Sequence, residues 1–230
     1  PSVKVIAELS KAELFVFNGL GMEPWIKTAY PNQMDMSKFV KLKHSAEGHE
    51  GHGHGHEDED PHYWLDIQNM ILMTEALTKE LKKHFPQHEQ EFTDNSNVYI
   101  EKLKALELEY SKVLETCSHR EIVVNHNAFA YLGERYAFDS HSITGLSPDE
   151  QASAKKMKEI TDLLSREKLN IIFFESFVSP KLAQTIAKET GVKVESLQPL
   201  ANVTEAEAKK GYIALMRENL RKLSAAMECE

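Results

Sequence analysis

Short apolar runs alternate with amphipathic stretches from residue 119 to the end of the chain. The runs have the composition of buried strands, and the stretches between them repeat apolar residues with helical spacing. Repeated strand–helix units of this kind predict a parallel sheet covered by helices on both faces. The predicted strands are 121–125, 138–143, 170–174 and 192–194.

Capping residues mark the expected ends of the helices in the same region. The last helix begins with a capping box, in which Thr204 and Glu207 satisfy each other's backbone donors. The other predicted helices are 128–136, about 148–166 behind an N-cap at Ser147, and one that Ser179-Pro180 opens and Gly191 ends.

The sequence of the first half of the chain predicts fewer strands and helices than the region after residue 119. A short helix over 2–12 precedes the apolar run Leu14–Phe17, which is typical of a buried strand, and the turn NGLGMEPW then leads to a short helix near Trp25. Pro86 ends a later helix that starts near Ile67. These elements resemble part of another α/β domain, with too few strands to be complete.

One helix is predicted to be unusually long. Apolar residues recur three and four positions apart from Tyr99 to Cys117, and the whole helix is expected over about 87–117. Such a length exceeds that of the average globular helix, and the repeat covers fewer heptads than a coiled coil needs. We therefore expect a rigid strut that packs along the body of the protein.

Composition excludes several classes of function. The 230 residues carry 36 acidic against 27 basic side chains, a formal net charge of −9, whereas nucleic-acid binding needs clustered Lys and Arg. No apolar run approaches the roughly 20 residues of a membrane span. Cys117 and Cys229 lack CxxC spacing, which argues against a thiolate zinc site, and free thiols are favoured over a disulfide.

The segment from His44 to His62 carries the plainest chemical signal. It holds six of the eleven histidines, mixed with glycines and acidic residues. Nothing in it before Tyr63 can build a core, but neutral imidazole is the commonest protein ligand for zinc and similar metals. Residues 43–60 are expected to form a surface loop that collects metal weakly at several sites. The accessory ligands are His44, His49, His52, His54 and His56.

Two histidines stand apart from this loop because each lies at the boundary of an ordered element. His62 begins the segment HYWLD, which leads into a helix, and His126 follows the predicted strand 121–125. Ligands of open α/β sheets bind at the carboxyl ends of the strands, where His126 is expected. A lone histidine is more often a surface or core residue, but two such placements together favour a metal site.

Four motifs resemble one known family. The segments NGLGMEPW, PHYWLD, NHNAFAYLGERY and FFESFVSPKLAQTIAKETGVKV are similar to motifs of the metal-binding receptors of ATP-driven zinc and manganese importers, the ZnuA-like solute-binding proteins of cluster A-I. The resemblance covers essentially the whole chain, and the His-rich acidic loop marks the zinc branch. It implies two α/β lobes with parallel sheets covered by helices, joined by one long rigid helix.

The resemblance also implies a partition of the chain and a set of metal ligands. The N-terminal lobe is 1–86, partial and including the loop 43–60, the linking helix is 87–117, and the C-terminal lobe is 118–230. His62 and His126 match two metal-histidine motifs, one from each lobe. The family's first metal histidine lies upstream of the segment that matches Pro1-Ser2, so the N-terminal lobe is expected to be truncated.

Other polar residues are candidates with weaker support. Gln198 stands in LQPL, where the family often has an aspartate, and an amide is a poor zinc ligand. Glu175, in the family's FxE segment, is expected to orient a ligand histidine by hydrogen bonding in preference to binding metal itself. His141 in SHSITG could face the metal site between the two lobes. His84, His88 and His119 are expected to be histidines without a ligand role.

The function that the resemblance implies is capture of Zn²⁺ between two lobes and its delivery to the membrane permease of an ABC importer. Such a receptor is a monomer when full length, and it is periplasmic or otherwise extracytoplasmic and membrane-tethered. The alternatives are a manganese or other divalent-metal receptor of the same fold, and a metal buffer or chaperone in which only the loop matters. A metal-dependent hydrolase is disfavoured because neither HExxH nor a similar helix motif is present, and no catalysis is implied because the sequence shows no nucleophile–base pair and no GxSxG.

Overall fold

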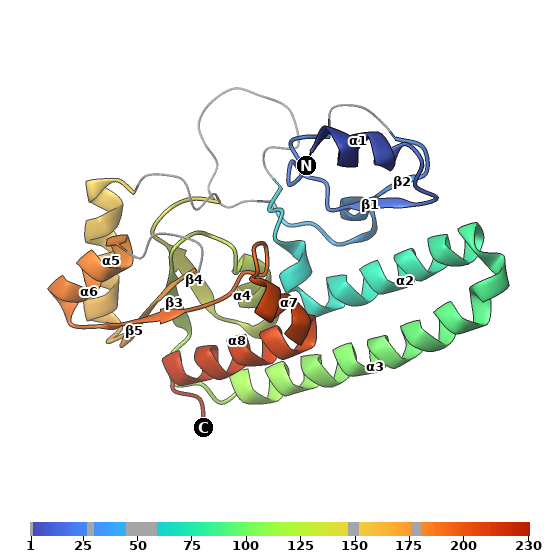
Figure 1. Cartoon of the computed structure of the whole chain (residues 1–230). Helices are drawn as coiled ribbons and strands as arrows, with labels where there is room; N and C mark the ends of the chain where they lie inside the picture. The colour runs from blue at the N-terminus through green and yellow to red at the C-terminus, as the bar shows by residue number, and fades with distance from the viewer. Residues whose placement is uncertain (1, 27–29, 45–58, 147–151, 176–180) are drawn as a thin grey trace. The chain divides into compact units, whose positions relative to one another are not determined.

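The computed structural model describes residues 2–26, 30–44, 59–146, 152–175 and 181–230. They form two compact units, Pro1–Lys104 and Ala105–Glu230 (Figure 1). Helix α3 (Glu89–Leu114) continues through the boundary between them. Each unit contains a parallel sheet, and the predicted α/β class with parallel sheets covered by helices is confirmed.

The C-terminal unit is built on a four-stranded sheet with the strand order β4-β3-β5-β6, in which every neighbouring pair is parallel. All four predicted strands are confirmed to within two residues at their ends. The strands are β3 (Glu121–Val124), β4 (Asp139–Ser142), β5 (Ile171–Phe174) and β6 (Lys193–Ser196). The helices that follow α3 are α4 (Ala130–Tyr136), α5 (Ala154–Arg166), α6 (Lys181–Thr190), α7 (Glu205–Lys210) and α8 (Tyr212–Ala226).

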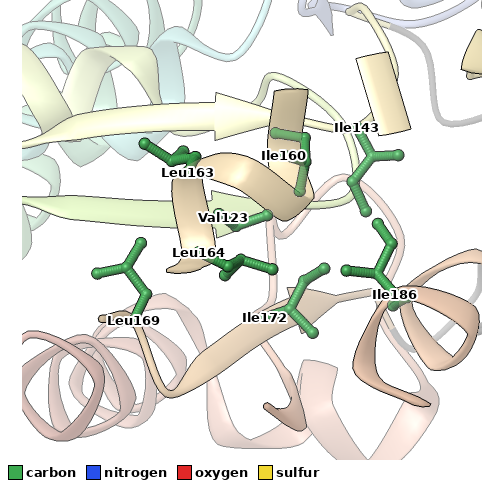
Figure 2. Packing of buried hydrophobic residues seen from close by; sticks show 9 residues of the cluster. Val123, Ile143, Ile160, Leu163, Leu164, Leu169, Ile172 and Ile186 are labelled. Atoms are coloured by element: carbon green, nitrogen blue, oxygen red, sulfur yellow. The ribbon is translucent and has the colours of Figure 1, made fainter. Parts of the chain in front are cut away.

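Packing of aliphatic side chains holds the helices α5 and α6 against one face of this sheet. Val123 of β3 and Ile172 of β5 are paired across the ladder and fully buried. Figure 2 shows them among Ile160 and Leu164 of α5 and Ile186 of α6. Each such side chain contributes about 1.5–3 kcal/mol on burial, so this cluster fixes the strand ends from which the candidate site projects.

The N-terminal unit contains a two-stranded parallel sheet of β1 (Phe15–Phe17) and β2 (Gln33–Asp35). The helices predicted near residues 2–12 and 67–86 are present. The helical elements of this unit, in addition to the first part of α3, are α1 (Val3–Leu9), the 3-10 turns η1 (Met36–Phe39), η3 (Tyr63–Leu65) and η4 (Pro86–His88), and α2 (Ile67–His84).

Three local predictions are wrong in part. The described residues around Trp25 form a turn, in which the Ile26 N–H donates to the Glu23 carbonyl. Helix α5 begins at Ala154, because the Ser153 hydroxyl accepts from the Lys156 N–H, 3.1 Å away. The predicted cap at Ser147 lies outside the described residues. The capping box of Thr204 and Glu207 is confirmed, but its helix α7 stops after two turns at Gly211, whose φ is +79°.

The two cysteines form a disulfide, so the preference for free thiols is wrong. That preference assumed a disordered C-terminus. Instead, the Leu223 and Met227 side chains are completely buried, and they carry the last residues back to the end of α3. There the Ser118 and His119 N–H groups donate to the carbonyls of Glu228 and Met227. Cys117 and Cys229 are thereby brought opposite each other in a short antiparallel bridge.

The disulfide closes a loop with a sequence separation of 112, so its loss is expected to destabilise the C-terminal unit. We predict that the double variant Cys117→Ser/Cys229→Ser unfolds in urea with a free energy about 2–4 kcal/mol lower than that of the parent chain. The parent chain in reductant is the matched control and is expected to lose a similar amount. An unchanged midpoint in both samples would contradict the assignment.

Candidate metal centre

His62 is held by the residues immediately before it. The Asp60 carboxylate oxygen Oδ1 accepts the backbone N–H of His62 at 2.9 Å and lies 2.7 Å from the ring nitrogen Nδ1. Between them, Pro61 has a fixed φ, which favours this Asx-turn. Asp60 and His62 are 2% and 4% exposed. The sequence Asp-Pro-His therefore encodes a buried carboxylate–imidazole pair within three residues.

Buried polar contacts fix the backbone around this pair. Asn69, which is fully buried on α2, donates from Nδ2 to the carbonyls of Lys41 and Tyr63 at 3.0 and 3.2 Å. Its Oδ1 accepts the N–H of Lys41 at 2.9 Å. The Tyr63 hydroxyl donates to the Asn18 carbonyl at 2.7 Å, next to the end of β1. These bonds join the start of η3 to both α2 and the strand end.

His126 lies at the carboxyl end of β3, as predicted. Its ring is 2% exposed, and Nδ1 is hydrogen-bonded to Oε1 of Glu175. Glu175 directly follows β5, which is the neighbour of β3 in the sheet. Because parallel strands end at the same edge, the fold itself brings this carboxylate to the imidazole. The structure thus places Glu175 where the sequence analysis expected a group that orients a histidine.

The turn that carries His126 is fixed by its neighbouring strand connection. The Asn125 carbonyl accepts the N–H groups of Ile143 and Thr144 at 3.1 and 2.9 Å, and also the Thr144 hydroxyl at 3.1 Å. The Asn127 N–H donates to the Gly145 carbonyl at 2.9 Å. The residues on both sides of His126 are therefore tied to the segment that follows β4, and the imidazole projects from a rigid turn.

Gln198 lies beyond the end of β6, and its polar atoms take part in structural hydrogen bonds. Its Nε2 donates to Glu207 at 3.2 Å, and its Oε1 accepts the Leu200 N–H at 3.3 Å. Its backbone N–H and carbonyl pair with the Asn219 side chain at 3.0 and 2.7 Å. Hydrogen bonds from Thr204, and then from Gln198, lower the pKa of Glu207 and keep it ionised.

Nearby, Lys222 Nζ donates to the Ser196 hydroxyl at 2.8 Å, and partial burial lowers the pKa of this lysine. The end of β6 therefore consists of residues that hydrogen-bond to one another.

The other candidate histidines are placed elsewhere. His141 is paired in register with Val123 inside the sheet, and its Nε2 is hydrogen-bonded to Glu121 at the opposite end of β3 from His126. His44 is exposed and forms an isolated antiparallel bridge with Glu59. His84, His88 and His119 each lie 3.3–3.7 Å from a carboxylate. The remaining loop candidates His49, His52, His54 and His56 lie outside the described residues.

Within either unit, the described residues form no group of three or more His, Cys, Asp or Glu side chains arranged to hold a metal ion. Each unit instead offers one buried imidazole whose Nδ1 is bonded to a carboxylate. Among the described helices, none is long and apolar enough to cross a membrane.

A family model described as "zinc-uptake complex component A periplasmic" (ZnuA) matches residues 1–226. The chain belongs to this family. It is 34% identical over 248 residues to the zinc-binding lipoprotein AdcA of Streptococcus pneumoniae serotype 4, covering 100% of this chain and 49% of the relative. It is 33% identical over 241 residues to the high-affinity zinc uptake system protein ZnuA of Bacillus subtilis strain 168, covering 99% and 76%.

Solved structures agree with this membership. The laminin-binding protein Lbp of Streptococcus pyogenes superimposes with a TM-score of 0.86 at 29% identity, covering 99% of this chain and 87% of that chain. The Zn(II)-bound ZnuA-like domain of Streptococcus pneumoniae AdcA gives 0.79 at 31% identity, covering 99% and 85%. The chain spans about half the length of the AdcA relatives. The family resemblance and the fold predicted from its motifs are confirmed.

Sequence reasoning missed Asp60 and Asn69 as residues that position His62. Asp60 is hidden in the run of acidic residues that ends the His-rich segment. Its only signal is the Asp-Pro spacing of an Asx-turn. Asn69 is a polar residue on a helix that is otherwise recognised by its apolar face, and its contact with Lys41 spans 28 residues.

We predict that Asn69→Ala lowers the free energy of unfolding by about 1–3 kcal/mol, because it removes the side-chain partner of the Lys41 N–H and carbonyl and one of the two donors to the Tyr63 carbonyl. The measurement is urea unfolding of the purified chain, followed by far-ultraviolet circular dichroism. Asn97→Ala, at an exposed position of α3, is the matched control. Equal losses in the two variants would show that the clamp does not stabilise the unit.

Proposed function

We propose that this chain is a zinc-binding receptor in which Nε2 of His62 and Nε2 of His126 bind the same Zn²⁺ ion. The observation that supports this most is the matching state of the two imidazoles. Each is nearly fully buried, and each has Nδ1 bonded to a carboxylate. In protein zinc sites, a ligand histidine characteristically donates its other ring N–H to a carboxylate or carbonyl.

The chemistry of the two pairs suits zinc. A carboxylate at Nδ1 favours the tautomer with the proton on Nδ1 and increases electron density at Nε2, the nitrogen that would bind the metal. Imidazole nitrogen is a preferred ligand for Zn²⁺, whereas Mn²⁺ favours carboxylate and carbonyl oxygen. Gln198 offers an amide in place of a carboxylate, which supports zinc over manganese.

The roles of the other candidates follow from their contacts. Glu175 is proposed to remain bonded to His126 and to orient it, in agreement with its position after β5. Gln198 is proposed to be structural, since its amide already bonds to Glu207 and Leu200. His141 bonds to Glu121 at the opposite end of β3 from His126, so it is proposed to have no ligand role.

The biological role proposed is delivery of zinc to the permease of an ABC importer from outside the cytoplasm. The family's description as a periplasmic component of a zinc-uptake complex supports this role, as do the names of the zinc-binding relatives. The disulfide between Cys117 and Cys229 fits an oxidising compartment. In this proposed receptor, residues 1–86 form the N-terminal lobe, 87–117 the linking helix and 118–230 the C-terminal lobe. No catalytic step is proposed.

The His-rich loop 43–60 is proposed to act as an accessory collector of zinc, on the strength of its sequence alone. Its many imidazoles, separated by glycines and acidic residues, would bind metal weakly but at several sites at once. This role is secondary, because a collector needs a tighter site to which the ion passes.

We predict that His62→Ala and His126→Ala each weaken zinc binding by more than the roughly 10–100-fold that loss of a partner to a ligand histidine costs. The loss of zinc affinity in the double variant should not exceed that in the weaker-binding single variant, because both substitutions remove the same site. The binding that remains in the double variant should be the weak binding of the loop. Competition titration with a zinc chelator measures the affinity. His88→Ala, at a side chain 52% exposed, is the control and should bind normally.

Replacing residues 45–58 with a short Gly-Ser linker separates the receptor from a metal buffer. The described residues His44 and Glu59 at the base of the loop stay in place. A receptor should keep one tight zinc site and lose only weaker binding events in isothermal titration calorimetry. Loss of nearly all binding would instead identify the chain as a buffer whose loop is the functional element.

A further inference from the structure

We infer that Asp60 is a positioning residue for zinc: it holds the His62 ring in the Nδ1–H tautomer and so directs Nε2 to the metal. This inference deepens the proposed function and rests on it, because it assigns a role at the same site. In the sequence, Asp60 ends an acidic run that otherwise suggests only a charged surface. In the structure, it is 2% exposed.

The geometry around Asp60 leaves its carboxylate little freedom. One oxygen, Oδ1, accepts both the backbone N–H of His62 and the contact from ring Nδ1, at 2.9 and 2.7 Å. The Asp60 backbone N–H donates to the Lys43 carbonyl at 2.9 Å, on the opposite strand of the short bridge that closes the base of the loop. The carboxylate is therefore fixed through its own backbone as well as through the turn.

The ring itself is also fixed. His62 packs edge-on against Trp64, with ring centroids 5.5 Å apart. A carboxylate can only accept a hydrogen bond, so the nitrogen that faces it must carry the proton. In the neutral ring with this tautomer, Nε2 is the nitrogen that would bind a metal, and no tautomer change is needed when zinc binds.

The chain builds this arrangement twice by different routes. For His126, the carboxylate of Glu175 arrives from the next strand of the sheet, 49 residues away. For His62, it arrives from two residues earlier in the chain, through an Asx-turn. The same pairing from unrelated local structures indicates that the pairing serves the imidazoles and is not a by-product of either turn.

The inference changes how the His-rich loop should be removed. A deletion of residues 43–60 would also remove Asp60 and its anchor at Lys43, so a loss of zinc binding could not be attributed to the loop. Exchange of 45–58 alone leaves both in place.

The experiment uses the whole chain and compares Asp60→Asn with Glu59→Gln. Both variants remove one negative charge at neighbouring positions, and it is the Asp60 carboxylate that is hydrogen-bonded to Nδ1 of His62. Asparagine can form the same Asx-turn, so Asp60→Asn should keep the thermal midpoint of the parent chain. The readouts are the ¹⁵N chemical shifts of the His62 ring in zinc-free protein, assigned with His62→Ala, and the zinc affinity from chelator competition.

We expect the parent chain and Glu59→Gln to show the Nδ1–H tautomer at His62 and the same zinc affinity. Asparagine keeps an acceptor at Oδ1 that is neutral and therefore weaker, so Asp60→Asn should show a smaller Nδ1–H population at His62 and a zinc affinity up to roughly 10–100-fold weaker, at unchanged thermal midpoint. An Nε2–H tautomer in the parent chain would overturn the inference, as would equal affinities for Asp60→Asn and Glu59→Gln. If His62→Ala binds zinc normally while the parent chain shows the Nδ1–H tautomer, the proposed zinc ligand fails and the positioning contact stands as structure only.

Discussion

Burial of an imidazole beside a carboxylate is the interaction on which the candidate site depends. A buried histidine without a partner would lose the hydrogen bonds that water supplies, at a cost of about 1–3 kcal/mol. The Asp60 and Glu175 carboxylates supply a partner to Nδ1 of His62 and of His126, and in the proposed site the same contacts place the ring proton on Nδ1. The stability of each turn and the chemistry of each imidazole thus have the same physical origin.

The scaffold that creates these pairs differs between the units. In the C-terminal unit, the aliphatic cluster around Val123 and Ile172 fixes neighbouring strands β3 and β5, so their carboxyl ends bring His126 and Glu175 together. In the N-terminal unit, a short-range Asx-turn brings Asp60 to His62, and the Asn69 side chain of α2 hydrogen-bonds to the backbone next to this turn. The edge of a sheet thus positions the His126–Glu175 pair, whereas an Asp-Pro-His turn positions the His62–Asp60 pair.

Much of this could be predicted from the sequence, because period and composition determine the strands and helices locally. The position of His126 follows from the apolar run before it, and α3 follows from its regular apolar spacing. The contacts that could not be predicted join residues far apart in the chain. The pairing of Cys117 with Cys229 depends on how α8 packs, and the burial of Asp60 depends on Lys43 across a loop. Neither of these long-range contacts is visible in a local pattern, although the Asp-Pro-His spacing does signal the Asx-turn itself.

We propose that one zinc ion is bound through the nitrogen of each imidazole that does not face a carboxylate. Crystals of the zinc-loaded chain, with anomalous diffraction measured at the zinc absorption edge, test it most directly. We expect one strong zinc peak at about 2.0–2.1 Å from Nε2 of both His62 and His126, with Asp60 and Glu175 still hydrogen-bonded to Nδ1. A tight zinc site bound through Nδ1 of either ring, or one that includes neither histidine, would contradict it.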